Sequence, residues 1–155
     1  MTIDFTLTVQ QQHAFFRSGA TRSLAFRRAQ LRKLAAAIEA RESLLLEALH
    51  ADLRKSPYQA FATEIGLVLS ELHHAARHLA AWMKPKACGT PWLAWPARGF
   101  VRPEPYGVAL IVGPWNYPFQ LLLSPLAGAM AAGNCAVLKP SEYAPRTAAA
   151  IAQLV

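Results

Sequence analysis

Acidic residues are scarce in this 155-residue chain. It has 9 Asp and Glu against 16 Lys and Arg, which gives a formal net charge of +7 at pH 7. Such a surplus makes nucleic acid or an anionic membrane surface candidate partners. Nine of the cations lie between Arg17 and Lys55, where several acids follow closely, and on a helix most of them point away from the apolar stripe. We interpret this pattern as a solvated helix face and expect no nucleic-acid partner.

Cysteine is also rare. Cys88 and Cys135 have neither the spacing of a metal-binding pair nor that of a disulfide framework, which suits a reducing compartment. Cys135 lies in an apolar, strand-like run, where we expect a buried and inert thiol.

No uninterrupted apolar run is long enough to span a bilayer. The most hydrophobic stretch, residues 106–138, is broken by glycine, asparagine and proline. The first residues lack the basic-then-apolar pattern of a secretion signal. Hydrophobic residues nevertheless make up 54% of the chain and charged residues only 16%, which excludes a disordered protein. The sequence therefore predicts a soluble, cytoplasmic protein without a membrane span.

Residues 1–84 have the pattern of helices. Apolar residues recur at helical spacing from about Leu24 to Ala40, and a second stripe continues through Leu53. Ser56 and Pro57 form a typical helix start, since the serine caps free N–H groups and proline suits the first turn. That helix is predicted to run to Lys84.

Residues 85–105 differ in composition. Five prolines interrupt them, and Trp92, Trp95 and Phe100 supply apolar side chains. We predict an extended crossing segment with a short strand around Phe100 to Arg102. So many aromatic residues in a loop indicate packing against something else, such as another subunit.

Residues 106–155 predict a strand–helix–strand–helix unit. Gly107 to Val112 is a continuous apolar run, typical of a strand buried on both faces. A helix from Pro118 to Ala132 follows, closed by Gly133 in a left-handed cap. Cys135 to Leu138 is a second strand, and a last helix begins at Pro145. The fold class is therefore α/β, with N-terminal helices followed by the start of a parallel sheet.

Polar residues follow both predicted strands. Asn116 comes after the first, and Lys139 and Glu142 come after the second. Loops at the carboxyl ends of parallel strands emerge on one side of the sheet, where ligands bind. A lysine and a glutamate suit a phosphate or a ribose diol, and an asparagine amide suits an oxyanion. A solvated lysine and a turn asparagine are equally good interpretations of the residues alone.

Two known kinds of site are absent. The G-x-G-x-x-G fingerprint does not follow the first strand, which excludes a standard dinucleotide-binding turn there. His74 and His78 have the spacing of a two-histidine metal site, but no glutamate stands between them in the required place and no third ligand is evident. We expect solvated or hydrogen-bonded histidines and no metal.

Two segments, residues 105–119 and 131–142, resemble aldehyde dehydrogenases. The Trp-Asn-Tyr-Pro-Phe sequence at 115–119 is similar to the class 3 branch of that family, as is the N-terminal half, including His50 to Ser56. The resemblance covers nearly all of the chain. It implies a Rossmann-like domain that binds NAD or NADP, and the oxidation of aldehydes to carboxylic acids.

The resemblance also implies residue roles. Asn116 is expected to hold the substrate carbonyl oxygen as the catalytic donor, and Tyr117 to face the aldehyde tunnel. The residues expected to contact the cofactor lie in the same two loops; they are Gly113, Pro114, Trp115, Lys139, Ser141 and Glu142. Because the second loop carries both a cation and an acid, it leaves NAD and NADP open.

Other expectations concern what the family has elsewhere. Phe100 to Glu104 resembles the start of an oligomerisation arm, which implies a homodimer. Neither Cys88 nor Cys135 matches the motif of the family's cysteine nucleophile, and the glutamate base and the catalytic domain are not matched either. We therefore expect the 155-residue chain alone to be inactive. The alternative is a non-catalytic module that associates with full-length subunits.

Overall fold

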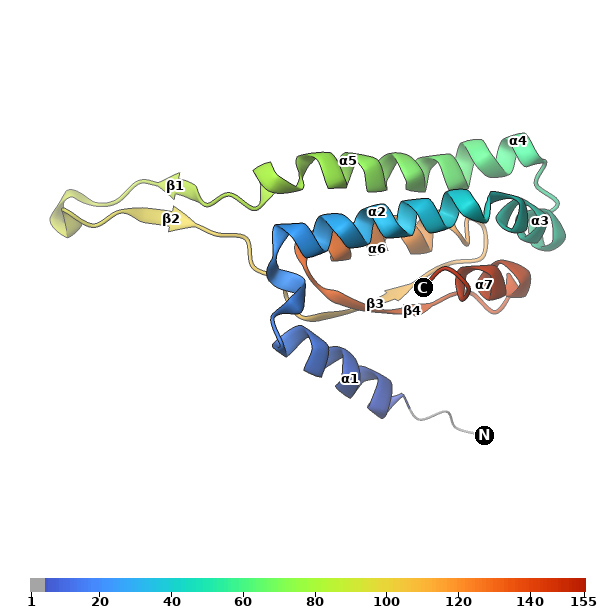
Figure 1. Ribbon diagram of the computed structural model, residues 1–155, viewed down its shortest axis with the longest axis horizontal. Coiled ribbons are helices and arrows are strands. Elements are labelled where there is room, and N and C mark those ends of the chain that lie inside the picture. Colours follow the sequence, from blue (N-terminus) through green and yellow to red (C-terminus); the bar gives the residue numbers. More distant parts are fainter. Residues whose placement is uncertain (1–4) are drawn as a thin grey trace.

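The computed structural model describes residues 5–155 (Figure 1). The helices are α1 (Thr6–Arg17), α2 (Leu24–Ala40), α3 (Glu42–Leu53), α4 (Pro57–Ala60), α5 (Gly66–Trp82), α6 (Gln120–Ala132) and α7 (Pro145–Ile151). The strands are β1 (Lys86–Cys88), β2 (Gly99–Val101), β3 (Val108–Val112) and β4 (Cys135–Lys139). A π-helical segment, Phe61–Ile65, joins α4 to α5 without a break.

The core lies between three helices that run side by side, α2, α5 and α6 (Figure 1). Their facing sides carry fully buried aliphatic residues at helical spacing, which is the pattern that predicted α2 and α5. The largest of these side chains are Leu31, Ile38, Leu72, Leu79, Leu122 and Leu123. Burying a side chain of this size stabilises the fold by roughly 1.5–3 kcal/mol, so this layer fixes α6 and whatever α6 carries.

Strands β3 and β4 are parallel, as predicted, and pair from Val108 opposite Cys135 to Val112 opposite Lys139. Helix α6 joins them and packs on one face of the pair, where Ile111 is buried. The prediction that the first strand is buried on both faces is wrong. Leu110 and Val112 point to the other face and are 68% and 60% exposed, because no element of residues 5–155 covers them.

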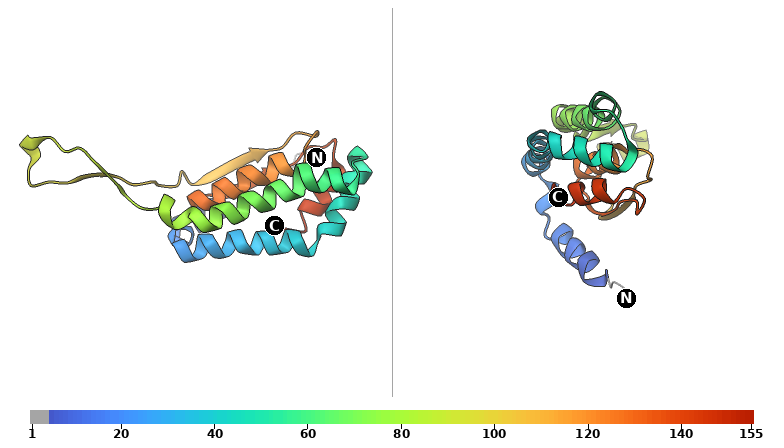
Figure 2. Two further views of the ribbon diagram at one scale, coloured as in Figure 1. Left: turned by 90° about the horizontal axis from the view of Figure 1, so that it is seen from above. Right: turned by 90° about the vertical axis from the view of Figure 1, so that its right-hand side faces the viewer.

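Helix α1 was not predicted. It packs against β4 and β3 and has no buried residue of its own. Figure 2 shows it projecting from the body of the molecule. Without a fully buried stripe, its sequence lacks the periodic signal that identified α2 and α5.

The proline-rich segment forms a hairpin arm rather than a simple crossing. Strands β1 and β2 pair antiparallel, from Lys86 opposite Val101 to Cys88 opposite Gly99. The predicted strand at Phe100 is present, one residue earlier than expected. The arm extends away from the helices (Figures 1 and 2). Trp92 and Trp95 near its tip are 83% and 84% exposed.

The local signals for helix ends are confirmed at two places. Ser56 precedes α4, and its hydroxyl accepts a hydrogen bond from the Gln59 amide. Gly133 ends α6 with φ +89°, the left-handed cap. Within residues 5–155, no helix combines the length and the apolarity needed to cross a membrane.

The two thiols differ in environment, which predicts different reactivity. Cys88 is exposed on the arm, whereas Cys135 is buried, and its burial raises the pKa of the thiol. Because the thiolate is the reactive form, we expect alkylation at Cys88 first, with Cys135 reacting slowly at neutral pH and faster as the pH rises. Mass spectrometry of the iodoacetamide-treated chain measures both rates. Equal rates in the folded chain, as in urea, would contradict the placement of Cys135.

Candidate functional site

The loops that follow β3 and β4 lie side by side, as the parallel arrangement predicted. The amide of Gly113 donates a hydrogen bond to the carbonyl oxygen of Lys139, 3.0 Å away, where one loop begins and the other strand ends. Gly113 is buried, and a Cβ atom there would lie 3.1 Å from the side chain of Leu122 on α6. The lack of a side chain at Gly113 therefore lets the loop start close against α6.

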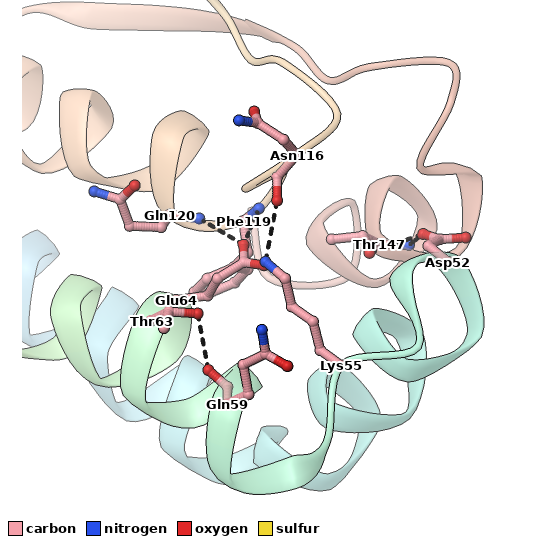
Figure 3. A network of polar contacts seen from close by, with 9 residues as sticks. All are labelled: Asp52, Lys55, Gln59, Thr63, Glu64, Asn116, Phe119, Gln120 and Thr147. Carbon is pink, nitrogen blue, oxygen red and sulfur yellow. Dashed lines mark hydrogen bonds and ion pairs between the residues drawn. The ribbon is translucent and has the colours of Figure 1, made fainter.

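Asn116 is exposed in the first loop, and its backbone rather than its side chain is held. Its carbonyl oxygen accepts a hydrogen bond from Lys55 Nζ, 3.1 Å away. Figure 3 shows the side-chain amide pointing away from Lys55. Within residues 5–155 this amide has no hydrogen-bond partner, so its N–H groups are available to an oxygen atom of a ligand.

The neighbours of Asn116 are also largely exposed. Pro114, Trp115 and Tyr117 are all accessible, and the Tyr117 ring lies under the ammonium group of Lys55, with 4.0 Å between Nζ and the ring centroid. A cation at this distance from an aromatic face is attracted to it. The contact limits the positions open to the Tyr117 ring.

A buried ion pair supports this loop from below (Figure 3). Lys55 and Glu64 pair with each other, and Glu64 is fully buried. The second carboxylate oxygen of Glu64 accepts hydrogen bonds from the amides of Phe119, at 2.9 Å, and Gln120, at 3.2 Å. Those amides begin α6, so Glu64 satisfies donors that no residue of α6 satisfies.

The second loop carries an exposed pair of opposite charge. Lys139 Nζ lies 2.9 Å from Glu142 Oε2. The hydrogen bond from Lys139 holds the pKa of the Glu142 carboxyl below its usual range, so the carboxylate is ionised at neutral pH. Ser141 is buried, and its hydroxyl accepts a hydrogen bond from the Tyr143 amide within the turn. Its predicted cofactor contact stays a prediction, and the structure shows that it also shapes the loop.

Three supporting residues were not predicted as part of the site, namely Asp52, Lys55 and Glu64. For Glu64 the sequence did hold a signal. It stands four residues before Val68 and eight before Leu72, so it continues the buried stripe of α5 into the π-helical segment. A carboxylate in an apolar stripe requires partners, so its position already indicated a buried polar contact.

The other chemistry-bearing residues lie elsewhere. Cys135 opens β4, at the opposite end from the loops, and Cys88 is on the arm. The rings of His74 and His78 stack, with 4.1 Å between centroids. Among the residues that the structure describes, no group of three or more His, Cys, Asp or Glu side chains is arranged to hold a metal ion. A cavity of 580 Å³ between α1, α2 and β4 contains none of the predicted site residues.

Comparisons with known proteins identify the family of the chain. The model of the aldehyde dehydrogenase family matches residues 4–155. The 4,4'-diaponeurosporen-aldehyde dehydrogenase of Staphylococcus aureus is 46% identical over 92% of this chain and 31% of its own length. Aldehyde dehydrogenase family 3 member B1 of Bos taurus is 42% identical over 97% of this chain and 32% of its own. The chain thus spans about a third of the length of these curated relatives.

Solved structures show the same fold. A substrate-bound Staphylococcus aureus AldH matches all of this chain and 34% of its own, with a TM-score of 0.96 and 44% identity. An indole-3-acetaldehyde dehydrogenase of P. syringae, in complex with NAD+ and IAA, matches 94% of this chain and 29% of its own, with a TM-score of 0.83 and 30% identity. The predicted fold class, helices followed by the start of a Rossmann-like sheet, is confirmed. The chain belongs to the aldehyde dehydrogenase family.

Proposed function

We propose that this chain supplies the oxyanion donor and the adenosine-ribose contacts of an enzyme that oxidises aldehydes to carboxylic acids with NAD or NADP. The observation that carries the proposal is the exposed, unpaired amide of Asn116, whose backbone is anchored to Lys55. A donor that is already in place stabilises a developing negative charge without reorganising during the reaction. Its partner in this role is the carbonyl oxygen of the aldehyde.

The second loop fits a ribose. Lys139 donates and Glu142 accepts, and both side chains are more than half exposed at the carboxyl end of β4. When bound, the nicotinamide supplies the hydride acceptor. In this chain we expect Gly113, Pro114 and Trp115 to line the crevice that holds the cofactor, and Tyr117 to face the aldehyde. NAD and NADP both remain compatible with the pair of charges.

The test is the replacement of Asn116 with alanine. We expect kcat/KM for aldehyde oxidation to fall by roughly 100- to 1,000-fold, as it does when one oxyanion donor is lost. Neither loop provides the cysteine nucleophile that the family resemblance implies. Formation of NADH or NADPH is therefore measured on the whole polypeptide that the gene encodes. Gln153→Ala, which removes an exposed amide from the last turn, is the matched control and leaves the rate unchanged. Equal rates for Asn116→Ala and the parent would refute the assignment.

We also propose that the arm joins two copies of the protein into a homodimer. Its exposed residues Trp92, Leu93 and Trp95 form an apolar surface of the kind that interfaces bury. Replacing both tryptophans with serine is therefore expected to weaken self-association at least tenfold, measured by sedimentation velocity across a range of concentrations. Trp82→Ser, which changes a tryptophan on α5 rather than on the arm, is the control. An unchanged dissociation constant in the double variant would exclude the arm.

The same surface favours a second candidate, a non-catalytic module that associates with full-length subunits. Co-purification with a full-length relative, without any aldehyde oxidation by the whole encoded polypeptide, would select it. In either case we propose a cytoplasmic protein, since both cysteines are free thiols and suit a reducing compartment.

A further inference from the structure

One short segment of the helical half contacts the first loop of the candidate site and the start of the helix that follows the second loop. It runs from the end of α3 to the π-helical segment and contains Asp52, Lys55 and Glu64. Figure 3 shows Lys55 and Glu64 below the first loop and Asp52 at the start of α7, just beyond the second. We call residues 52–64 the support segment.

The Lys55–Glu64 pair is costly in the place where it lies. Both side chains are almost completely buried. Moving two charges out of water carries a desolvation penalty, which their mutual attraction can fail to offset. A buried pair is therefore weak evidence of a role in stability alone. What distinguishes this pair is where its remaining hydrogen bonds go, since they reach the Asn116 carbonyl and the first amides of α6.

These bonds hold the site loop at two points. Asn116 is fixed through its carbonyl oxygen, and the chain is fixed again three residues later through the Phe119 amide. No side chain of the residues around the start of α6 caps that helix, so Glu64 provides the cap from 55 positions earlier. At the first anchor, the side-chain amide of Asn116 points outward and has no hydrogen-bond partner among residues 5–155 (Figure 3).

Asp52 does the same for the helix after the second loop. One oxygen of its carboxylate accepts a hydrogen bond from the Arg146 amide at 3.2 Å. The other accepts from the Thr147 amide at 2.7 Å and the Thr147 hydroxyl at 2.8 Å. These bonds fix the start of α7, and with it the end of the loop that carries Lys139 and Glu142. The support segment thus anchors the first loop directly and the second loop through the start of α7.

We propose that Lys55 and Glu64 are positioning residues for Asn116, and that the support segment sets the separation of the carbonyl donor from the ribose contacts. This inference rests on the proposed function, because the position of Asn116 matters only if its amide acts on a substrate. None of the three residues touches the reacting atoms. They act through the backbone of the loops.

The decisive variant removes the pair as a whole, Lys55→Met with Glu64→Leu. Replacing both charges with apolar side chains of similar size leaves no unpaired buried ion, so we expect the denaturant midpoint to fall less than it does when only one of the two charges is removed. The amides of Phe119 and Gln120 lose a charged acceptor. Their hydrogen exchange is expected to accelerate at least tenfold, which corresponds to the loss of about one charge-assisted hydrogen bond. In the whole encoded polypeptide, kcat is expected to fall about 10- to 100-fold, with the KM for NAD or NADP nearly unchanged.

The controls separate positioning from stability. Glu64→Gln is nearly isosteric and keeps one acceptor oxygen, so it is expected to retain more of kcat than the double variant does. Glu39→Gln removes an exposed carboxylate beside His73 and changes none of the three readouts. If the double variant keeps the parent's amide exchange and kcat, the pair does not position Asn116 and the inference is wrong.

Failure of the proposed function gives a different result. In that case the parent polypeptide itself oxidises no aldehyde, while exchange at Phe119 and Gln120 still reports whether the pair anchors the loop. Unchanged exchange in the double variant overturns the inference, whether or not the parent is active.

Discussion

Replacing Phe119 with alanine is expected to lower the free energy of unfolding by about 3–5 kcal/mol, the usual cost of deleting a fully buried aromatic side chain. Phe119 has no exposed surface and is among the largest fully buried side chains in the described residues. It stands directly before α6, where its amide also donates to Glu64. Its ring therefore holds the end of the Asn116 loop in the core. Urea denaturation followed by circular dichroism measures the change.

The matched control is Phe100→Ala, which removes the same side chain from the arm. Phe100 is 58% exposed, so the expected loss is below about 1 kcal/mol. A similarly small loss for Phe119→Ala would show that the region around the start of α6 is not tightly packed. The inference that Phe119 anchors the Asn116 loop would then be wrong. In the whole encoded polypeptide, we expect Phe119→Ala to lower kcat as well, because the loop gains freedom.

Local sequence signals predicted much of the fold. The apolar stripe gave α2 from Leu24 to Ala40, the bounds that the structure shows. The capping serine at 56 and the cap glycine at 133 are both in the conformations that their residue types favour. These features depend on neighbours within one helical turn, which is the range over which a single sequence is informative.

Contacts between distant parts of the chain were not predictable in the same way. Lys55 and Asn116 are 61 positions apart, and nothing in the sequence near either of them indicates the other. Helix α1 was missed because it packs without burying any residue completely, and the open face of β3 was missed because an apolar run does not reveal whether a covering element exists.

The candidate site falls between these cases. That the loops after β3 and β4 are adjacent followed from the rule for parallel strands, and the pairing of Val112 with Lys139 confirms it. The roles of Asn116, Lys139 and Glu142 came from the family resemblance and stay predictions. The support from Asp52, Lys55 and Glu64 required the three-dimensional structure.

Replacing Gly133 with alanine is the second change expected to have a large effect. Gly133 has φ +89°, and its amide and that of Asn134 donate to Met130 and Ala129 to close α6. A Cβ atom there would lie 2.5 Å from the guanidinium of Arg27. Arg27 is buried and donates to the carbonyl oxygens of Thr21, at 2.8 Å, and Ala131, at 3.3 Å. Its displacement therefore breaks two hydrogen bonds from a charged group.

The two costs add. A left-handed conformation costs a residue with a side chain about 1–2 kcal/mol, and loss of hydrogen bonds from a charged group costs about 1.5–3 kcal/mol, so Gly133→Ala is expected to destabilise the fold by roughly 2.5–5 kcal/mol. Gly128→Ala, in the same helix, is the control. A Cβ atom meets nothing within 4 Å there, and we expect a gain of about 0.5–1 kcal/mol from better helix propensity.

A double-mutant cycle between Gly133→Ala and Arg27→Ala tests whether the two costs arise from one contact. Because Arg27→Ala removes the atoms that the new Cβ would meet, the double variant should be more stable than the sum of the single changes predicts, leaving only the conformational cost of the left-handed residue. Additive free energies of unfolding would mean that the guanidinium moves aside without loss.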